Sequence, residues 1–249
     1  MVEEYVIAHL SDLHVGEDGF RSESVKRCIE EVNNLRPNLT IVTGDLTHNG
    51  LNEEFEKAKE LIDMFEDQPI IIMGNHDARN VGYKTFEEYF GKRMVRYEDD
   101  QIFLLGIDST QPDIDEGHIG RIFQENIHNI LSQIPENKTK IFALHHHLVP
   151  VPNAGRERDI VTDAGDVLNM LIEDDVSVVL CGHRHVPWVW NVEGLIIAHA
   201  GTLGSPRLVG MPNNSYLITR IRENSLQVSL KILGESEKPI KTVKYGSLE

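Results

Sequence analysis

The stretch Ile70-Ile71-Ile72-Met73-Gly74-Asn75-His76-Asp77 joins an apolar run to four residues of a different kind. The run predicts a short buried strand, because β-branched side chains favour strands. A polar turn after that strand accounts for Gly74 and Asn75 but gives no reason for His76. The stretch therefore predicts a strand that carries chemically active side chains at its carboxyl end, the usual place for a site in folds of alternating strands and helices.

Four other polar blocks each follow an apolar run, and together the five combine carboxylate, amide and imidazole groups. Oxygen and neutral nitrogen donors together suit Mn, Fe, Zn or Co, whereas an all-oxygen set suits Mg or Ca. Each block alone is a weak signal, but the set offers ligands for two adjacent metal ions. Such a pair is typical of phosphate-ester hydrolysis. The four blocks are Asp12-x-His14, Gly44-Asp45, His145 and Gly182-His183-x-His185.

These blocks resemble the motifs of the calcineurin-like metallophosphoesterases, which run Asp-x-His, Gly-Asp, Gly-Asn-His-Asp/Glu, His and Gly-His-x-His. The resemblance covers roughly residues 5 to 207. Within that family the sequence most resembles the class III cyclic-nucleotide phosphodiesterases. The segments that carry this finer resemblance are Gly44-Asp45-Leu46-Thr47 with Gly50, Gly74-Asn75-His76-Asp77 and Leu105-Gly106-Ile107-Asp108-Ser109. It implies an α/β fold, an αββα four-layer sandwich of two mixed β-sheets flanked by helices.

The resemblance also implies two divalent transition-metal ions, of which Mn, Fe, Zn and Co are the candidates. A carboxylate bridges two ions well, because its two oxygens can reach both and its charge offsets theirs. In the run of three histidines, His145 is the implied ligand because it follows the strand directly, and His146 and His147 would support the ligands or face the substrate. The implied assignment places Asp12, His14 and His185 on one ion and Asn75, His145 and His183 on the other, with Asp45 bridging both.

The implied reaction is hydrolysis of a small phosphodiester, such as a cyclic nucleotide, by a hydroxide that bridges the metals. His76 is not assigned as a ligand and would stand beside the leaving-group oxygen, which it would stabilise or protonate. Asp77 and Arg207 are further candidates for contacts with the ligands or the substrate. Arg184 is a second candidate phosphate contact, although both arginines also fit the ordinary role of surface side chains.

His48 departs from the patterns of related enzymes. Protein phosphatases place Asp and Arg-Gly after the bridging aspartate, and purple acid phosphatases place a tyrosine ligand three residues after it. In this chain His48 stands three residues after Asp45. Three roles fit His48: an extra metal ligand, a contact with the substrate, or an exposed histidine in a loop. The missing Arg-Gly argues against a protein phosphatase.

Three other functions compete with the phosphodiesterase. A nucleotidase or other phosphomonoesterase would use the same metals, and a non-catalytic scaffold would keep the fold alone. The intact ligand set and His76 argue against the scaffold. A nuclease subunit is disfavoured by the net charge of -16, because duplex binding relies on Lys and Arg. We therefore expect a small phosphate-ester substrate and no nucleic-acid partner. The oligomeric state and the natural substrate stay open.

The length of 249 residues with 40% hydrophobic side chains predicts one domain spanning residues 1–249. The N-terminal run is broken by polar residues, which argues against a signal peptide, and no apolar stretch approaches the ~20 residues of a membrane span. We expect a soluble, cytoplasmic protein. Its two cysteines, Cys28 and Cys181, fit buried core positions better than a disulfide.

Strand-like runs alternate with amphipathic helices up to Cys181, of which the segment from about Asn52 to Phe65 is the clearest. After Cys181 the pattern becomes strands alone, predicted to pair as hairpins around residues 193–194 and 223–224. The strands from about residue 187 are expected to complete the second sheet. His9 and His199 lie within strands and are predicted to be buried. Residues 149–159 form either a mobile lid or specificity loop, or an ordinary surface loop.

Overall fold

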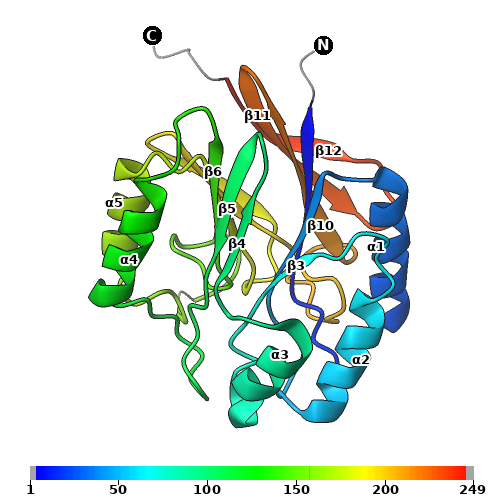
Figure 1. Cartoon of the computed structure of the whole chain (residues 1–249). Helices are drawn as coiled ribbons and strands as arrows, with labels where there is room; N and C mark the ends of the chain where they lie inside the picture. Colours follow the sequence, from blue (N-terminus) through cyan, green and yellow to red (C-terminus); the bar gives the residue numbers. More distant parts are fainter. Residues whose placement is uncertain (1–3, 157, 245–249) are drawn as a thin grey trace.

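Two mixed β-sheets pack face to face over residues 4–156 and 158–244, the parts of the chain that the computed structural model describes (Figure 1). The first sheet has the order β12 (Lys238–Lys244), β11 (Ser225–Ile232), β10 (Ser215–Arg222), β1 (Tyr5–Leu10), β2 (Leu39–Thr43) and β3 (Ile70–Ile72). The second has the order β4 (Val95–Glu98), β5 (Ile102–Gly106), β6 (Thr139–Ala143), β7 (Val178–Cys181), β9 (Leu195–His199) and β8 (Trp188–Val192).

Helices cover the outer face of each sheet, which completes the four layers (Figure 1). Helices α1 and α2 pack on the first sheet, and α4 and α5 pack on the second. The αββα sandwich expected from the sequence is therefore confirmed. The helices are α1 (Ser22–Leu35), α2 (Asn52–Ile62), α3 (Gly82–Phe90), which a short 3₁₀ turn at Arg79–Val81 precedes, α4 (Arg121–Leu131) and α5 (Ala164–Glu173).

Strand β1 illustrates how side-chain alternation builds the layers. Ala8 and Leu10 face the cluster under the helices of the first sheet, whereas Tyr5 and Ile7 face the cluster between the two sheets. Successive side chains of a strand point to opposite faces, so a strand buried on both faces is apolar throughout. Consequently the run is nearly all hydrophobic, and the polar His9 within it is fully buried, as predicted.

The elements named from the sequence are present, with shifts at their ends. Helix α2 ends at Ile62, three residues before Phe65, although Phe65 remains buried beside it. The hairpins around residues 193–194 and 223–224 join β8 to β9 and β10 to β11. Cys181 and His199 are fully buried, as predicted. The elements α3, α4, β4 and β12 were not named from the sequence.

The strands after residue 187 were expected to complete the second sheet, but only some of them belong to it. Only β8 and β9 join it, whereas β10, β11 and β12 extend the first sheet beyond β1. Strand β10 pairs antiparallel with β1 and covers what would otherwise be an exposed edge. Both sheets accept an alternating apolar strand, so sequence pattern alone does not tell which one a hairpin joins.

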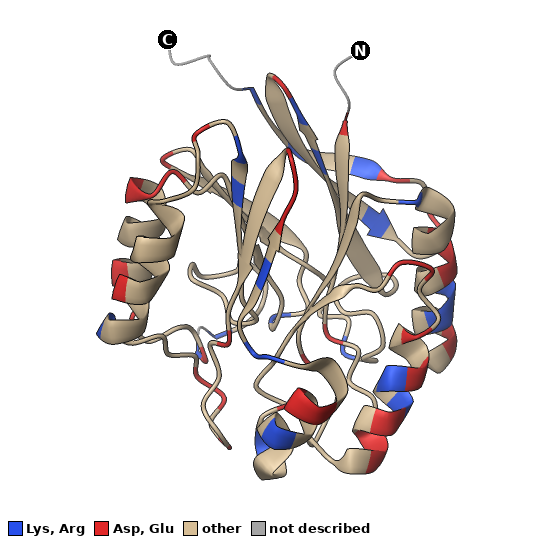
Figure 2. Cartoon of the chain, in the orientation of Figure 1, with Lys and Arg blue, Asp and Glu red and all other residues tan. Residues whose placement is uncertain are grey.

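The outer helix surfaces are polar, with acidic and basic side chains interspersed along α1 and α2 (Figure 2). No helix in the described part of the chain combines the length and apolar character needed to cross a membrane.

Candidate metal centre

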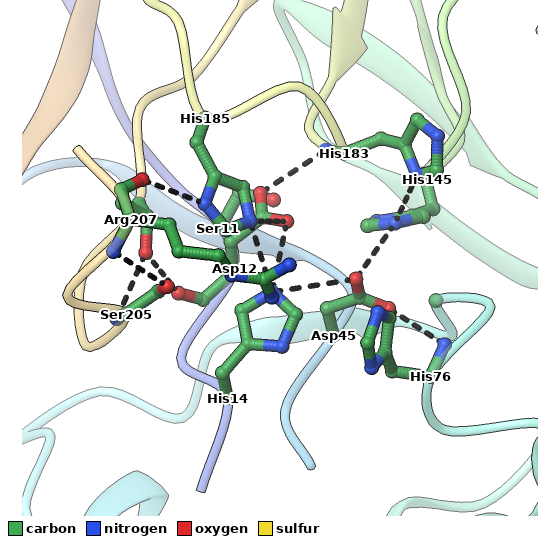
Figure 3. A network of polar contacts seen from close by, with 12 residues as sticks. Ser11, Asp12, His14, Asp45, His76, His145, His183, His185, Ser205 and Arg207 are labelled. Atoms are coloured by element: carbon green, nitrogen blue, oxygen red, sulfur yellow. Dashed lines mark hydrogen bonds and ion pairs between the residues drawn. The ribbon is translucent and has the colours of Figure 1, made fainter. Parts of the chain in front are cut away.

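The five polar blocks converge at the carboxyl ends of the central strands. They follow β1, β2 and β3 of the first sheet and β6 and β7 of the second, and both sets of strands run parallel. Backbone hydrogen bonds hold the loops together, from Asp12 N to Gly44 O at 3.0 Å and from Gly182 N to His145 O at 2.9 Å. The packing of the two sheets therefore brings residues from opposite ends of the chain into one cluster (Figure 3).

An unusual backbone conformation aims many of these side chains. Five of the seven predicted ligands adopt positive φ angles between 52° and 72°, a region that residues other than glycine seldom occupy. Such strain is typical of functional loops that the surrounding structure holds in place. The five are Asp12, His14, Asp45, His183 and His185.

Two glycines permit the close approach of these loops. Gly44 has a φ of +91°, and a Cβ there would lie 2.7 Å from Nδ1 of His145. A Cβ on Gly182 would lie 1.9 Å from Oγ of Ser11. The glycines of the Gly-Asp and Gly-His-x-His blocks are therefore required by the packing of the loops around the site.

The first ligand group consists of Asp12, His14 and His185, all buried. Oδ1 of Asp12 lies 3.2 Å from Nε2 of His185 and 3.6 Å from Nε2 of His14, and these two nitrogens are 2.9 Å apart. Nδ1 of His185 donates a 3.1 Å hydrogen bond to the carbonyl oxygen of Arg207. With the proton held on Nδ1, the lone pair of Nε2 faces Asp12 and His14.

The second group contains His145, His183, Asn75 and Asp45. Nδ1 of His145 donates a 2.6 Å hydrogen bond to the carbonyl oxygen of Thr43, which leaves a lone pair on Nε2. That nitrogen lies 3.1 Å from Oδ1 of Asn75 and 3.3 Å from Oδ2 of Asp45. Nδ1 of His183 lies 3.0 Å from the same Asn75 oxygen.

Asp45 lies between the two groups and faces both with a single oxygen. Its Oδ2 is 3.6 Å from Nε2 of His14 and 3.3 Å from Nε2 of His145 (Figure 3). Its Oδ1 instead accepts a 2.9 Å hydrogen bond from the backbone N–H of His76. The geometry thus differs from the expectation that both carboxylate oxygens share the bridge, because the backbone of the neighbouring loop occupies one of them.

The donor set fits divalent cations. Oδ1 of Asp12 is buried and accepts no hydrogen bond within the described residues. Burial raises the pKa values of the Asp12 and Asp45 carboxyls, but the adjacent histidines lower them by more. His185 has the largest lowering effect on Asp12 and His145 has the largest on Asp45, so both pKa values lie below the ordinary range. The converging carboxylate oxygens and imidazole nitrogens are the donor types that a divalent transition-metal ion binds, and a bound ion would displace any proton on the nitrogens that face it.

His76 and His48 border this cluster on its accessible side. Both are half-buried, with ring centroids 5.0 Å apart, and the His76 ring centroid is 4.6 Å from that of His14. Nδ1 of His76 lies 2.7 Å from the carbonyl oxygen of His48 and 2.8 Å from Nη1 of Arg79. His48 is therefore not a fully exposed loop side chain. Together with His14 and His76 it forms a third group close enough to hold an ion.

Asp77 and His146 support the loops instead of facing open space. The Asp77 carboxylate accepts hydrogen bonds from the backbone N–H groups of Leu46, Thr47 and Gly74, and so ties two of the ligand loops together. The His146 ring is fully buried, with Nδ1 2.8 Å from Oγ of Ser109 and Nε2 3.0 Å from the carbonyl oxygen of Asp115. Both ring nitrogens are thus engaged by the protein.

Sequence reasoning missed Asp115 and Arg79. Oδ1 of Asp115 accepts a 3.0 Å hydrogen bond from Nδ2 of Asn75 and a 2.6 Å bond from Nη2 of Arg79. This contact turns the Asn75 amide so that its oxygen faces the histidines of the second group. Asp115 lies in a loop without a motif, so only a search for a partner for the Asn75 amide would have indicated it.

Comparisons with known proteins place the chain among phosphoesterases. A family model for calcineurin-like phosphoesterases matches residues 5–187. A probable glycerophosphodiester phosphodiesterase (GpdQ) of Arcobacter nitrofigilis is 29% identical over 214 residues, covering 75% of this chain and 74% of that protein. A 3′,5′-cyclic-nucleotide phosphodiesterase of a Nostoc species is 24% identical over 189 residues, covering 72% and 71%. Both relatives are named as phosphodiesterases.

A solved structure agrees with the fold. A dimetal phosphatase from Danio rerio superposes with a TM-score of 0.76 at 9% identity, covering 97% of this chain and 99% of that one. At this identity the likeness shows a shared fold.

Proposed function

Because this chain belongs to the calcineurin-like phosphoesterase family of hydrolases, we propose that it is a dinuclear metal-dependent phosphodiesterase acting on small substrates such as cyclic nucleotides. The observation that carries the proposal is the position of Asp45, whose Oδ2 faces ligand groups on both sides. One group would hold the first ion through Asp12, His14 and His185. The other would hold the second through Asn75, His145 and His183, with Asp45 shared.

The protein's own residues fix the ligands before any ion or substrate arrives. Hydrogen bonds to the carbonyl oxygens of Thr43 and Arg207 set the tautomers of His145 and His185. When bound, two divalent cations supply a nucleophile from water near neutral pH and offset the charge that develops on the phosphoryl oxygens. Held in place by strained, buried loops, the ligands would not need to reorganise during the reaction.

His76 is the proposed catalytic acid. Its Nδ1 is engaged inside the protein, 2.7 Å from the carbonyl oxygen of His48 and 2.8 Å from Nη1 of Arg79, so Nε2 is the ring nitrogen left for the substrate. In the doubly protonated ring, Nε2 would donate its proton to the departing alkoxide. The half-buried position beside His14 keeps the ring within reach of a substrate bound at the ligand groups.

We propose a diester substrate instead of a monoester because the sequence relatives are named as phosphodiesterases. A phosphomonoesterase using the same residues is the second candidate. The ions themselves are proposed to be transition metals, with Mn²⁺ among those that suit mixed oxygen and nitrogen ligands.

The decisive experiment compares bis(p-nitrophenyl) phosphate with p-nitrophenyl phosphate at equal Mn²⁺ loading, with 2′,3′- and 3′,5′-cyclic nucleotides as further substrates. We expect turnover of the diester and of at least one cyclic nucleotide. A kcat/KM about tenfold or more higher for the monoester would instead identify a phosphomonoesterase. No turnover of any phosphate ester would support a scaffold.

A further inference from the structure

A cavity of about 310 Å³ opens beside the candidate metal centre and shares two of its histidines. It is notable for its charge: among its described lining residues there are four arginines and no acidic residue, in a chain whose net charge is -16. The cavity is lined by His183 and His185 and by Arg156, Arg158, Arg184 and Arg207.

Arg184 holds this cavity together. It stands between His183 and His185 in the sequence, and its guanidinium donates hydrogen bonds at 2.8 to 3.4 Å to the backbone carbonyl oxygens of Ala154, Arg156 and Arg158. These bonds fasten the segments around Ala154, Arg156 and Arg158 to the loop that carries two proposed ligands. Arg184 is therefore a positioning residue, which keeps the side chains of Arg156 and Arg158 next to the centre.

The other three arginines present guanidinium groups at the edge of the site. Arg207 pairs with Glu17, at 2.6 Å between Nε and Oε1, and its backbone holds His185. Arg156 and Arg158 are exposed, and among the described residues the Arg158 guanidinium pairs with Asp159, at 3.4 Å between Nε and Oδ2. An exposed ion pair such as that of Arg158 with Asp159 is weak and exchanges readily for an anionic ligand. The pair of Arg207 is more shielded, because the Glu17 side chain is only 9% exposed. Guanidinium groups bind phosphate and carboxylate through paired hydrogen bonds.

We propose that this cavity binds a second anionic group of the substrate, so that the enzyme favours phosphodiesters carrying an additional phosphate or carboxylate. The proposal rests on the proposed function, because it names a feature of the substrate cleaved at the adjacent centre. The scissile phosphate would lie at the ligand groups, and the second anion would lie among Arg156, Arg158 and Arg207. In an acidic protein, such a local positive cavity selects substrates by charge.

The test uses two substrates that differ only in the second anion: thymidine 5′-(p-nitrophenyl phosphate) and its 3′-phosphorylated counterpart. Release of p-nitrophenol reports cleavage of the same diester in both. For the Mn²⁺-loaded protein, we expect kcat/KM to be about tenfold or more higher for the 3′-phosphorylated compound. The Arg156→Ala/Arg158→Ala variant should bring this ratio close to one, whereas Arg96→Ala, an exposed arginine on β4, should keep it.

A binding measurement provides a second readout. Calorimetry should show that thymidine 3′,5′-bisphosphate binds more tightly than thymidine 5′-phosphate to the wild type but not to the double variant. Equal kcat/KM for the two esters in the wild type, or an unchanged ratio in the double variant, would overturn the inference and leave the proposed function standing. Hydrolysis of neither ester would overturn the proposed function, and the inference with it.

Discussion

Nδ2 of Asn75 donates a 3.0 Å hydrogen bond to Oδ1 of Asp115, a residue 40 positions further along the chain. An amide has one donor end and one acceptor end, so fixing the nitrogen decides where the oxygen points. Here the oxygen points to Nε2 of His145 and Nδ1 of His183. Partners that orient a ligand in this way commonly affect metal affinity as much as 10- to 100-fold.

Replacing Asp115 with Ala should therefore weaken binding of one of the two ions by about tenfold. The effect should be at the lower end of the 10- to 100-fold range, because the Asp115 side chain is 52% exposed and water can take its place. Titration calorimetry with Mn²⁺ or Zn²⁺ would measure the loss. The matched control is Glu116→Ala, which removes the same charge from the neighbouring exposed position. Equal affinities for the two variants would show that Asp115 does not orient Asn75.

Asp45→Asn should weaken both sites at once, because the variant loses the charge that offsets two cations while keeping the size of the side chain. We expect the wild type to retain two ions per chain after saturation with Mn²⁺ or Zn²⁺ and removal of excess metal, and the variant to retain fewer. Elemental analysis measures this directly, with Asp63→Asn on the surface as the control. A single stoichiometric ion in the wild type would refute the dinuclear assignment.

His76→Ala should lower kcat by about 100-fold or more while the metal content stays near that of the wild type, because His76 is assigned to the leaving group instead of an ion. Metal analysis and turnover are measured on the same preparation. His128→Ala, a partly exposed histidine on α4, serves as the control. If the variant loses an ion and excess metal restores full activity, His76 is a metal ligand. The group of His14, His48 and His76 would then hold one of the ions.

His199→Leu should make the protein less sensitive to acid. The His199 ring is fully buried in β9, neither nitrogen has a hydrogen-bond partner among the described residues, and burial lowers its pKa to about 3. The unfolded chain takes up a proton below about pH 6.5, whereas the folded chain resists it. Stability is therefore fully present above that pH and falls as the pH drops towards 3, by up to about 1.4 kcal/mol per pH unit from this residue.

Urea unfolding at pH 7 and pH 5 would measure that difference. The wild type should lose more free energy of unfolding between the two pH values than the variant does. The variant should also be at least as stable at pH 7, because it no longer buries an unpaired polar ring. An identical pH dependence in both proteins would show that His199 does not resist protonation in the folded state.

Much of this molecule follows from local sequence. The apolar run before Gly74 predicts β3, and the apolar residues on one face of residues 52–65 predict α2, because side-chain periodicity is set by the geometry of each element. The predicted ligands, from Asp12 to His185, come together in the structure because each follows a strand whose carboxyl end lies at the same side of the sandwich. Their roles as ligands await the metal analysis.

The sequence alone therefore determined the strand and helix pattern, the family resemblance and the chemical character of the site, since these depend on residue types and short spacings. Only the tertiary structure decided which sheet β10 joins, which oxygen of Asp45 faces both ligand groups, and which residues orient the ligands. Asp115 and Thr43 act on Asn75 and His145 through contacts between segments far apart in the chain. No local pattern encodes such contacts, because they arise only when the two sheets pack and bring their loops together.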